Sequence, residues 1–307
     1  MSIPLITIFT PTYNRAYCLH KCYQSLCRQM RKDFIWLIID DGSTDNTREL
    51  VDSWLSQDNG FEIQYVWKEN GGMHTAYNTA YELIRTELCM NIDSDDYVSD
   101  NAVDNILSFW EQNKRNDIGG IYALDCYEDG RIVGLPFPDD LTEFHGWGYQ
   151  DVFYYGPSGK KRVFHNSGDK KFIGVTKVIQ RYPPIPVFAG ERYHSLYYKQ
   201  HFIERDYTIL IYNYPVCVVE YMEDGSSNNM YFQYVKNPLG FCNERKFVMK
   251  HAPSFKLRFR ASIHYVAESF LARDYHFIKN ATNKMSTLIA LPLGILLYFW
   301  IKWKTRK

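Results

Sequence analysis

The sequence lacks the paired cysteines of a disulfide framework or a zinc site. Its 307 residues include seven cysteines, an odd number, and no CxxC pair. Cys18, Cys22 and Cys27 lie at near-helical spacing, which favours packing on one helix over metal binding. The chain also opens without a charged segment followed by an apolar signal core. These absences disfavour secretion, and a reducing cytosol is expected.

Two nucleotide-binding motifs are also missing. The sequence contains neither a GxGxxG fingerprint nor a GxxxxGK[ST] loop, which argues against a dinucleotide oxidoreductase and a P-loop phosphotransferase. It has no internal repeat and no Gly/Ser linker. With 46% hydrophobic and 17% aromatic residues, the chain can fill a large core and carry an appendage besides.

The formal net charge is zero, but the charges are unevenly distributed. Residues 244–307 carry thirteen Lys and Arg against three Asp and Glu, which gives +10, and residues 1–243 carry 22 against 32, which gives −10. A basic region of this kind suits an anionic partner, either nucleic acid or a lipid headgroup. Because no recognised nucleic-acid-binding motif accompanies the charges, no nucleic acid partner is expected.

The first 125 residues alternate β-rich runs with helical patterns. The predicted strands are residues 3–10, 34–40, 62–67 and 88–93, and the predicted helices are 17–30, 45–56, 75–85 and 102–113. This alternation predicts an α/β fold class, with a mostly parallel sheet covered by helices on both faces. Residues 126–190 are predicted to form loops and short strands, and an interrupted apolar run at 209–219 predicts one further strand.

Three carboxylates follow the apolar run 88–92. They belong to Asp93, Asp95 and Asp96, with Ser94 between the first two. A divalent metal that holds a diphosphate would offset this charge, because carboxylate oxygens suit Mg²⁺ and Mn²⁺. A solvated loop whose aspartates cap the next helix, near Asp100, is the alternative, and for an isolated tetrad it is the better one.

Three more polar turns each follow a predicted strand: residues 10–15, 40–45 and 70–72. In such sheets ligands bind beyond the carboxyl ends of the strands. Asp41 is placed to accept hydrogen bonds from a nucleobase imide or a ribose hydroxyl. Each turn also has a purely structural interpretation, as a helix cap at residues 42–45 and as a tight turn at Gly71 and Gly72.

The four motifs, in this order, resemble the inverting family 2 glycosyltransferases, which share the GT-A fold. The resemblance covers about residues 3–225 and implies a nucleotide-sugar donor, UDP-linked for preference, with Mn²⁺ or Mg²⁺ as cofactor. It implies Asp93, Asp95 and Asp96 as metal ligands. The donor-binding residues that it implies are Pro11, Thr12, Tyr13, Asn14, Arg15, Asp41, Asn70, Gly71, Gly72, Asp93 and Ser94.

An inverting transfer needs a base that takes the proton of the acceptor hydroxyl. Family members commonly carry this base in a Gly-Glu-Asp or Gly-Asp segment, and residues 188–192 stand at the matching position, so Glu191 is the expected catalytic residue. Arg192 occupies a place where a second acid is frequent, so Asp169 and Glu220 remain in reserve. An exposed loop glutamate with no catalytic role is the alternative.

The C-terminal region is both apolar and basic. Residues 285–301 contain no charge, and residues 302–307 carry four positive charges. Seventeen residues is the lower limit for a helix that spans a bilayer. The basic tail favours the cytoplasmic side, and the catalytic domain before the apolar segment has to meet a cytosolic donor, so both ends of the segment are expected on that side. An interfacial or re-entrant anchor is therefore expected. Residues 256–271 predict a basic amphipathic helix that lies on anionic lipid or packs on the catalytic domain.

Together these features predict a GT-A catalytic domain at 1–225 and a basic helical region at 226–307. The predicted enzyme is a hexosyltransferase of bacterial capsule or exopolysaccharide synthesis. It would act on a lipid-linked oligosaccharide acceptor at the cytoplasmic face of the membrane. Residues 221–228 look like a segment of capsule-cluster members of the family. The alternatives are a noncatalytic sugar-nucleotide or membrane-binding module and a metal-dependent nucleotidyltransferase, whose Gly-rich basic loop is missing.

Overall fold

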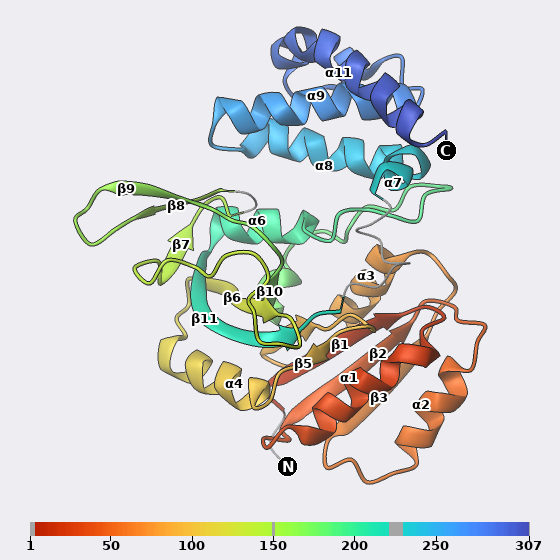
Figure 1. The fold of residues 1–307 in the computed structure, drawn as a ribbon, viewed down its shortest axis with the longest axis vertical. Helices are drawn as coiled ribbons and strands as arrows, with labels where there is room; N and C mark the ends of the chain where they lie inside the picture. The colour runs from red at the N-terminus through yellow and green to blue at the C-terminus, as the bar shows by residue number, and fades with distance from the viewer. Residues whose placement is uncertain (1–3, 149–150, 221–229, 307) are drawn as a thin grey trace. The chain divides into compact units, whose positions relative to one another are not determined.

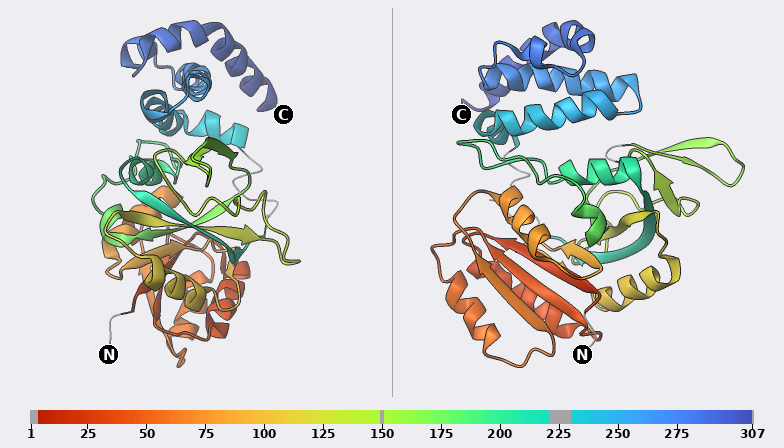
Figure 2. Two further views of the ribbon diagram at one scale, coloured as in Figure 1. Left: turned by 90° about the vertical axis from the view of Figure 1, so that its left-hand side faces the viewer. Right: turned by 180° about the vertical axis from the view of Figure 1, so that it is seen from behind.

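The computed structural model describes residues 4–148, 151–220 and 230–306, which form two compact units (Figures 1 and 2). The sheet unit comprises Met1–Pro184 and Lys199–Tyr221, and the helical unit comprises Ile185–Tyr198 and Met222–Lys307. Residues 185–198, which include Glu191, therefore belong with the C-terminal helices. The segment 221–228 lies outside the described residues.

The strands of the sheet unit form a nine-stranded mixed sheet within the described residues. Their order is β3-β2-β1-β4-β10-β6-β11-β5, and β7 pairs with β11. The pairs among β1 to β4 are parallel, and β10 runs antiparallel to both β4 and β6. The bounds are β1 (Ile6–Thr12), β2 (Phe34–Asp40), β3 (Glu62–Trp67), β4 (Leu88–Asn91), β5 (Tyr97–Val98), β6 (Ile118–Cys126), β7 (Glu143–His145), β10 (Lys170–Val175) and β11 (Thr208–Val218). A separate hairpin joins β8 (Asp151–Tyr155) to β9 (Lys161–His165).

Helices cover both faces of the parallel half of the sheet. On one face the ring of Tyr23 stacks on Trp54 at 4.3 Å and on Trp36 at 6.1 Å, so two helices share this face. On the other face Phe9 meets Tyr77 edge to face at 5.0 Å. The helices are α1 (Ala16–Arg28) and α2 (Thr47–Leu55) on the first face and α3 (Met73–Leu83) on the second; α4 (Ala102–Asn113), α5 (Thr176–Ile179) and α6 (Tyr198–Asp206) follow along the chain. Strands buried on both faces explain the continuous apolar runs.

The predicted α/β fold with a mostly parallel sheet is confirmed. The strands β2 and β3 and the helix α4 begin and end at the predicted residues. Two strands lie in the middle of the sheet: β6, which the sequence patterns did not indicate, and β10, which falls in the region 126–190 where short strands were predicted without bounds. The interrupted pattern of β11 corresponds to register shifts against β6 between Ile211 and Cys217.

The helical unit contains α7 (Met230–Lys236), α8 (Pro238–His251), α9 (Phe255–Leu271), α10 (Phe277–Asn280) and α11 (Lys284–Lys304). The central helix α9 packs against α8 and α11, which buries Leu257, Tyr265 and Val266. A Cβ atom on Gly294 of α11 would lie 2.5 Å from Val266, so glycine allows the two helices to approach closely. One side of α9 is thus covered by α8 and α11 of the same unit.

Candidate functional site

The polar turns after the first strands leave one edge of the sheet. In the parallel register Thr12 lies opposite Asp40, and Asp40 lies opposite Trp67. On the other side of β1, Phe9 lies opposite Asn91 at the end of β4. Because all four strands are parallel, their following turns emerge side by side at the carboxyl edge, where α/β sheets bind ligands. The sheet therefore brings the four predicted motifs together.

The turns after β1 and β2 are tied to each other by side chains. Asn14 has a left-handed backbone conformation (φ 53°), which asparagine tolerates. Its Oδ1 accepts hydrogen bonds from Thr44 N at 2.8 Å and Asp45 N at 3.3 Å, and its N–H donates to Ser43 Oγ at 2.9 Å. Asp45 Oδ2 in turn accepts from Ala16 N, at the start of α1, at 3.2 Å. These bonds give the predicted residue Asn14 a structural role in shaping the site.

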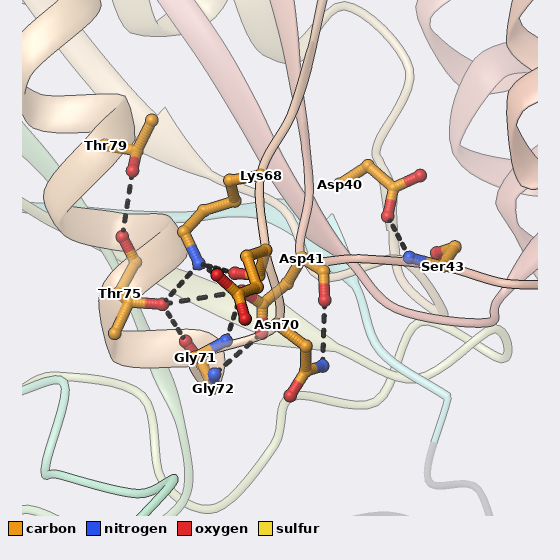
Figure 3. A network of polar contacts seen from close by, with 10 residues as sticks. Asp40, Asp41, Ser43, Lys68, Asn70, Gly71, Gly72, Thr75 and Thr79 are labelled. Carbon is orange, nitrogen blue, oxygen red and sulfur yellow. Dashed lines mark hydrogen bonds and ion pairs between the residues drawn. The ribbon is translucent and has the colours of Figure 1, made fainter. Parts of the chain in front are cut away.

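Asp41 organises the turn after β3 (Figure 3). Its Oδ1 lies 2.5 Å from Lys68 Nζ and accepts from Gly71 N at 3.0 Å, while its Oδ2 accepts from Gly72 N at 2.7 Å. Asn70 Nδ2 donates to the Asp41 carbonyl oxygen at 2.8 Å. Four residues that the sequence motifs predict for the site, Asp41, Asn70, Gly71 and Gly72, are in direct contact in the structure. It adds Lys68, a surface-type residue that no motif indicated.

The turn after β1 combines buried and exposed groups. Pro11 and Thr12 are buried, and the Thr12 hydroxyl has no hydrogen-bond partner among the described residues. A buried hydroxyl of this kind can accept or donate a hydrogen bond to a ligand without displacing a protein partner. Tyr13 is 46% exposed, and Arg15, half-buried, donates to the hydroxyl of Tyr17. This turn offers an exposed aromatic ring and a cation beside the buried hydroxyl.

The four residues of the acidic tetrad, 93–96, differ in how deeply they are buried. Asp93 and Asp95 are half-buried, whereas Ser94 and Asp96 are each 7% exposed. Asp93 Oδ1 accepts from Asn91 Nδ2 at 3.3 Å. Asp96 Oδ1 accepts from Glu220 N at 3.1 Å, which joins the tetrad to the end of β11. Helix α4 begins after Asn101, and among the described residues the hydrogen bonds of the Asp96 carboxylate come from Glu220 N and Cys217 Sγ, not from the first turn of this helix.

A buried lysine and a further buried aspartate lie close to the acidic tetrad. Lys171 of β10 and Asp125 of β6 are 6% and 2% exposed, and Lys171 Nζ lies 3.9 Å from Asp125 Oδ1. Burial raises the pKa of Asp125 to about 6 and the pKa of Asp96 to about 8, and in both cases the charge of Lys171 opposes the shift. Burial by itself would lower the pKa of Lys171, but the negative charge of Asp125 and of other neighbouring groups outweighs this effect. The pKa of Lys171 is therefore well above its usual value. Lys171 therefore supplies part of the positive charge that this acidic region needs.

The arrangement suits a divalent metal that shares its ligands with a substrate. In the part of the chain that the structure describes, no group of three or more His, Cys, Asp or Glu side chains is placed to hold a metal alone. Asp93 and Asp95 nevertheless provide two partly accessible carboxylates at the strand end. Mg²⁺ is commonly bound by one or two carboxylates together with substrate phosphates. The residues present fit a metal of that kind.

Glu191 belongs to the helical unit, whereas the strand-end motifs belong to the sheet unit. Its Oε1 accepts from Leu239 N and its Oε2 from Gly240 N, each at 2.8 Å. These are N–H groups of the first turn of α8, which otherwise have no intrahelical partner. Of the reserve acids, Asp169 is exposed, and Glu220, which pairs with Lys21, is bonded through its backbone to Asp96.

Comparison with solved structures defines the class of fold. The TarS fragment 1–349 from S. aureus, solved in complex with UDP-GlcNAc, matches with a TM-score of 0.57 at 16% identity, over 94% of this chain and 80% of that chain. The mannosyltransferase PcManGT from Pyrobaculum calidifontis, solved with GDP-Man and Mn²⁺, matches with a TM-score of 0.56 at 14% identity, over 96% of this chain and 74% of that one. The chain has the GT-A fold.

The family model Glycosyl transferase family 2 matches residues 7–171, more than half of the chain, so the chain belongs to this family of glycosyltransferases. The "Uncharacterized glycosyltransferase EpsJ" of Bacillus subtilis is 31% identical over 39% of this chain and 35% of its own length. The chondroitin synthase of Pasteurella multocida is 34% identical over 46% of this chain and 15% of its own. The match thus spans about a third or less of these relatives.

Proposed function

We propose that the chain is an inverting glycosyltransferase that moves a sugar from a nucleotide-diphosphate donor, a UDP-sugar, to a lipid-linked oligosaccharide. The observation that carries the proposal is the meeting of four polar turns at one sheet edge, with Asp93 and Asp95 half-buried there. The UDP-GlcNAc in a solved relative supports the donor class. Relatives that make polysaccharides support a place in capsule or exopolysaccharide synthesis.

Each turn has a proposed task in donor binding. Asp41 receives the uracil edge through Oδ2, which among the described residues accepts only from Gly72 N. Thr12 and Tyr13, with Pro11, Asn14 and Arg15 around them, line the nucleotide pocket. Asn70, Gly71 and Gly72 lie close to the donor. Asp93, Ser94 and Asp95 approach the diphosphate and its metal, Mn²⁺ or Mg²⁺.

When bound between Asp93, Asp95 and the diphosphate, the metal would offset the charge that develops on the leaving nucleotide. Asp96 is proposed either to complete the ligand set or, because Glu220 N occupies its Oδ1, to hold the loop in place. The residues of the chain bind and orient the donor, and a carboxylate takes the proton of the attacking acceptor hydroxyl. Attack on the opposite face from the leaving group gives inversion.

A panel of nucleotide-sugars tests the function. We expect release of free nucleotide from one UDP-sugar, stimulated by Mn²⁺ and abolished by a chelator, and transfer to a polyprenyl-diphosphate-linked acceptor. Tight nucleotide-sugar binding without turnover on any donor would instead identify a noncatalytic module. Release of pyrophosphate from a nucleoside triphosphate and a sugar phosphate would identify a nucleotidyltransferase.

Glu191 is the proposed base, and Glu191→Gln tests it. We expect transfer to fall by about 10² to 10⁴, the usual contribution of a positioned base, with donor affinity nearly unchanged. The glutamine keeps one oxygen for the first turn of α8, so the free energy of unfolding should fall by only about 1 kcal/mol. Initial rates, donor titrations and chemical denaturation measure the three quantities.

Asn237→Ala is the matched control, because Asn237 precedes α8 and its Oδ1 accepts from Arg192 N at 2.7 Å. It disturbs the same helix start and leaves the carboxylate of Glu191 intact. If both variants lost transfer equally, the effect would belong to the helix and not to a base. If Glu191→Gln kept full turnover, the base would have to be sought at Glu220 or Asp169.

A further inference from the structure

Helix α11 has a covered face and an open one. On the covered face Ser286, Thr287, Ala290, Gly294 and Ile301 are buried. Ser286 Oγ lies 2.7 Å from Ser262 Oγ of α9 in a buried hydrogen bond. The open face carries large apolar side chains that are between 41% and 69% exposed, and we call it the outer face of α11. Its members are Met285, Leu288, Ile289, Leu293, Leu296, Phe299, Trp300 and Trp303.

The outer face is a continuous stripe. Its residues recur at intervals of three and four, so they follow one side of the helix for its whole length. A contiguous apolar surface of this size marks an interaction site in a folded protein. One member of the stripe, Trp300, meets Tyr231 of α7 edge to face at 4.9 Å, and α9 covers the opposite side of α11. For the rest of the outer face, a partner has to lie outside the helical unit as described.

The charges around the outer face identify that partner as anionic. Lys284 stands at the start of the stripe, and Lys302, Lys304 and Arg306 stand at its end. No acidic residue follows Asp274 in the sequence. Self-association through this face would bring like charges together in either helix direction, since both ends of the stripe are positive. An anionic lipid surface complements both the apolar stripe and its basic ends.

The packing of α11 decides how it meets a bilayer. With 21 residues, the helix would be about 31 Å long, enough to cross a hydrocarbon core of about 30 Å. Crossing would, however, strip α11 from α9 or carry α9 along, and α9 contains Lys256, Arg258, Arg260 and the buried Glu268. Charged groups of this number are costly inside a membrane. Lying flat leaves the covered face intact.

The aromatic end of the helix suits the headgroup level. Lys304 Nζ lies 6.0 Å from the ring centroid of Trp300 and 5.3 Å from that of Trp303. Tryptophan rings and lysine stems of this kind sit where the apolar and polar layers of a membrane meet. We propose that the outer face of α11 is a docking surface for anionic phospholipid, with the helix parallel to the bilayer and not across it.

This docking surface deepens the proposed function, since it would hold a transferase beside a lipid-linked acceptor, but its test needs no transfer. The 307-residue chain is floated with phosphatidylcholine vesicles that contain or lack phosphatidylglycerol. We expect it to float with the anionic vesicles and to be released by high salt and by alkaline carbonate. The double variant Leu296→Glu/Phe299→Glu should lower the lipid partition coefficient at least about tenfold.

Leu55→Glu is the matched control, because Leu55 of α2 is also apolar and 44% exposed. It should float like the unchanged chain, and circular dichroism should show the same helix content in all three proteins. Retention in the membrane after carbonate extraction would overturn the flat orientation in favour of a span. If the unchanged chain did not float, or if it formed a dimer that the double variant did not form, lipid would be overturned as the partner. Nucleotide-sugar turnover, measured in parallel, reports on the proposed function separately.

Discussion

Replacing Asp95 by asparagine is expected to lower turnover at least about a hundredfold. The half-buried carboxylate follows β4 at the sheet edge where the donor is proposed to bind, and asparagine removes its charge with little change in shape. The loss should appear as a lower kcat and a higher Mn²⁺ concentration for half-maximal rate. Initial rates over a series of Mn²⁺ concentrations measure both, with the donor found in the nucleotide-sugar panel.

Asp100→Asn is the control for this prediction. Asp100 follows the same loop, its side chain is 79% exposed, and it pairs with Arg28 at 3.5 Å, so its loss should leave turnover and metal dependence unchanged. Asp95→Asn with wild-type kcat and Mn²⁺ dependence would refute a metal role for the tetrad. In the same assay Asp96→Asn separates its two proposed roles: a loss as large as that of Asp95→Asn would make Asp96 a direct ligand, and a smaller loss would make it a positioning residue.

The sequence predicted the parallel half of the sheet because its signals there are local. The strands β1 and β2 are buried on both faces, so β2 is apolar up to Asp40 and the apolar residues of β1 are interrupted only by threonines. Each strand is followed by a turn with its own signature, such as Asn14 or Gly42. Since parallel strands end at one edge, the order of the motifs was enough to bring Asp41 and Asn70 together. Lys68 was missed because a lysine beside a turn has no distinctive pattern.

The other half of the sheet could not be predicted in this way. β10 lies between β4 and β6, more than forty residues after either strand along the chain, and it runs antiparallel to both. Its first two residues are lysines, which suggest an exposed segment, yet Lys171 is buried against Asp125. Only the tertiary pairing of β10 with β6 places this lysine behind the tetrad. The segment that carries Glu191 likewise joins the helical unit through contacts that are distant in sequence.

The buried Lys171–Asp125 pair leads to a second large effect, on stability. Lys171→Met keeps the length of the side chain and removes its charge, which leaves Asp125 buried without a counter-charge. Removal of one partner of a buried pair typically costs about 3–5 kcal/mol, so the free energy of unfolding should fall by that amount near neutral pH. Chemical denaturation measures it. Lys177→Met, on an exposed lysine of α5, should change it by less than about 0.5 kcal/mol.

The dependence of this loss on pH separates charge from packing. Burial raises the pKa of Asp125 to about 6, above the usual value of about 3.9, so below the folded pKa the carboxyl is largely neutral and has less need of Lys171. As the pH rises, Asp125 ionises, and without Lys171 its buried charge lowers the free energy of unfolding. The loss caused by Lys171→Met should therefore be smaller at pH 5 than at pH 8. The double variant Lys171→Met/Asp125→Asn should recover most of the loss at pH 8, because it leaves no unpaired charge at this pair. A loss that is the same at both pH values and in the double variant would show that Lys171 contributes by packing alone.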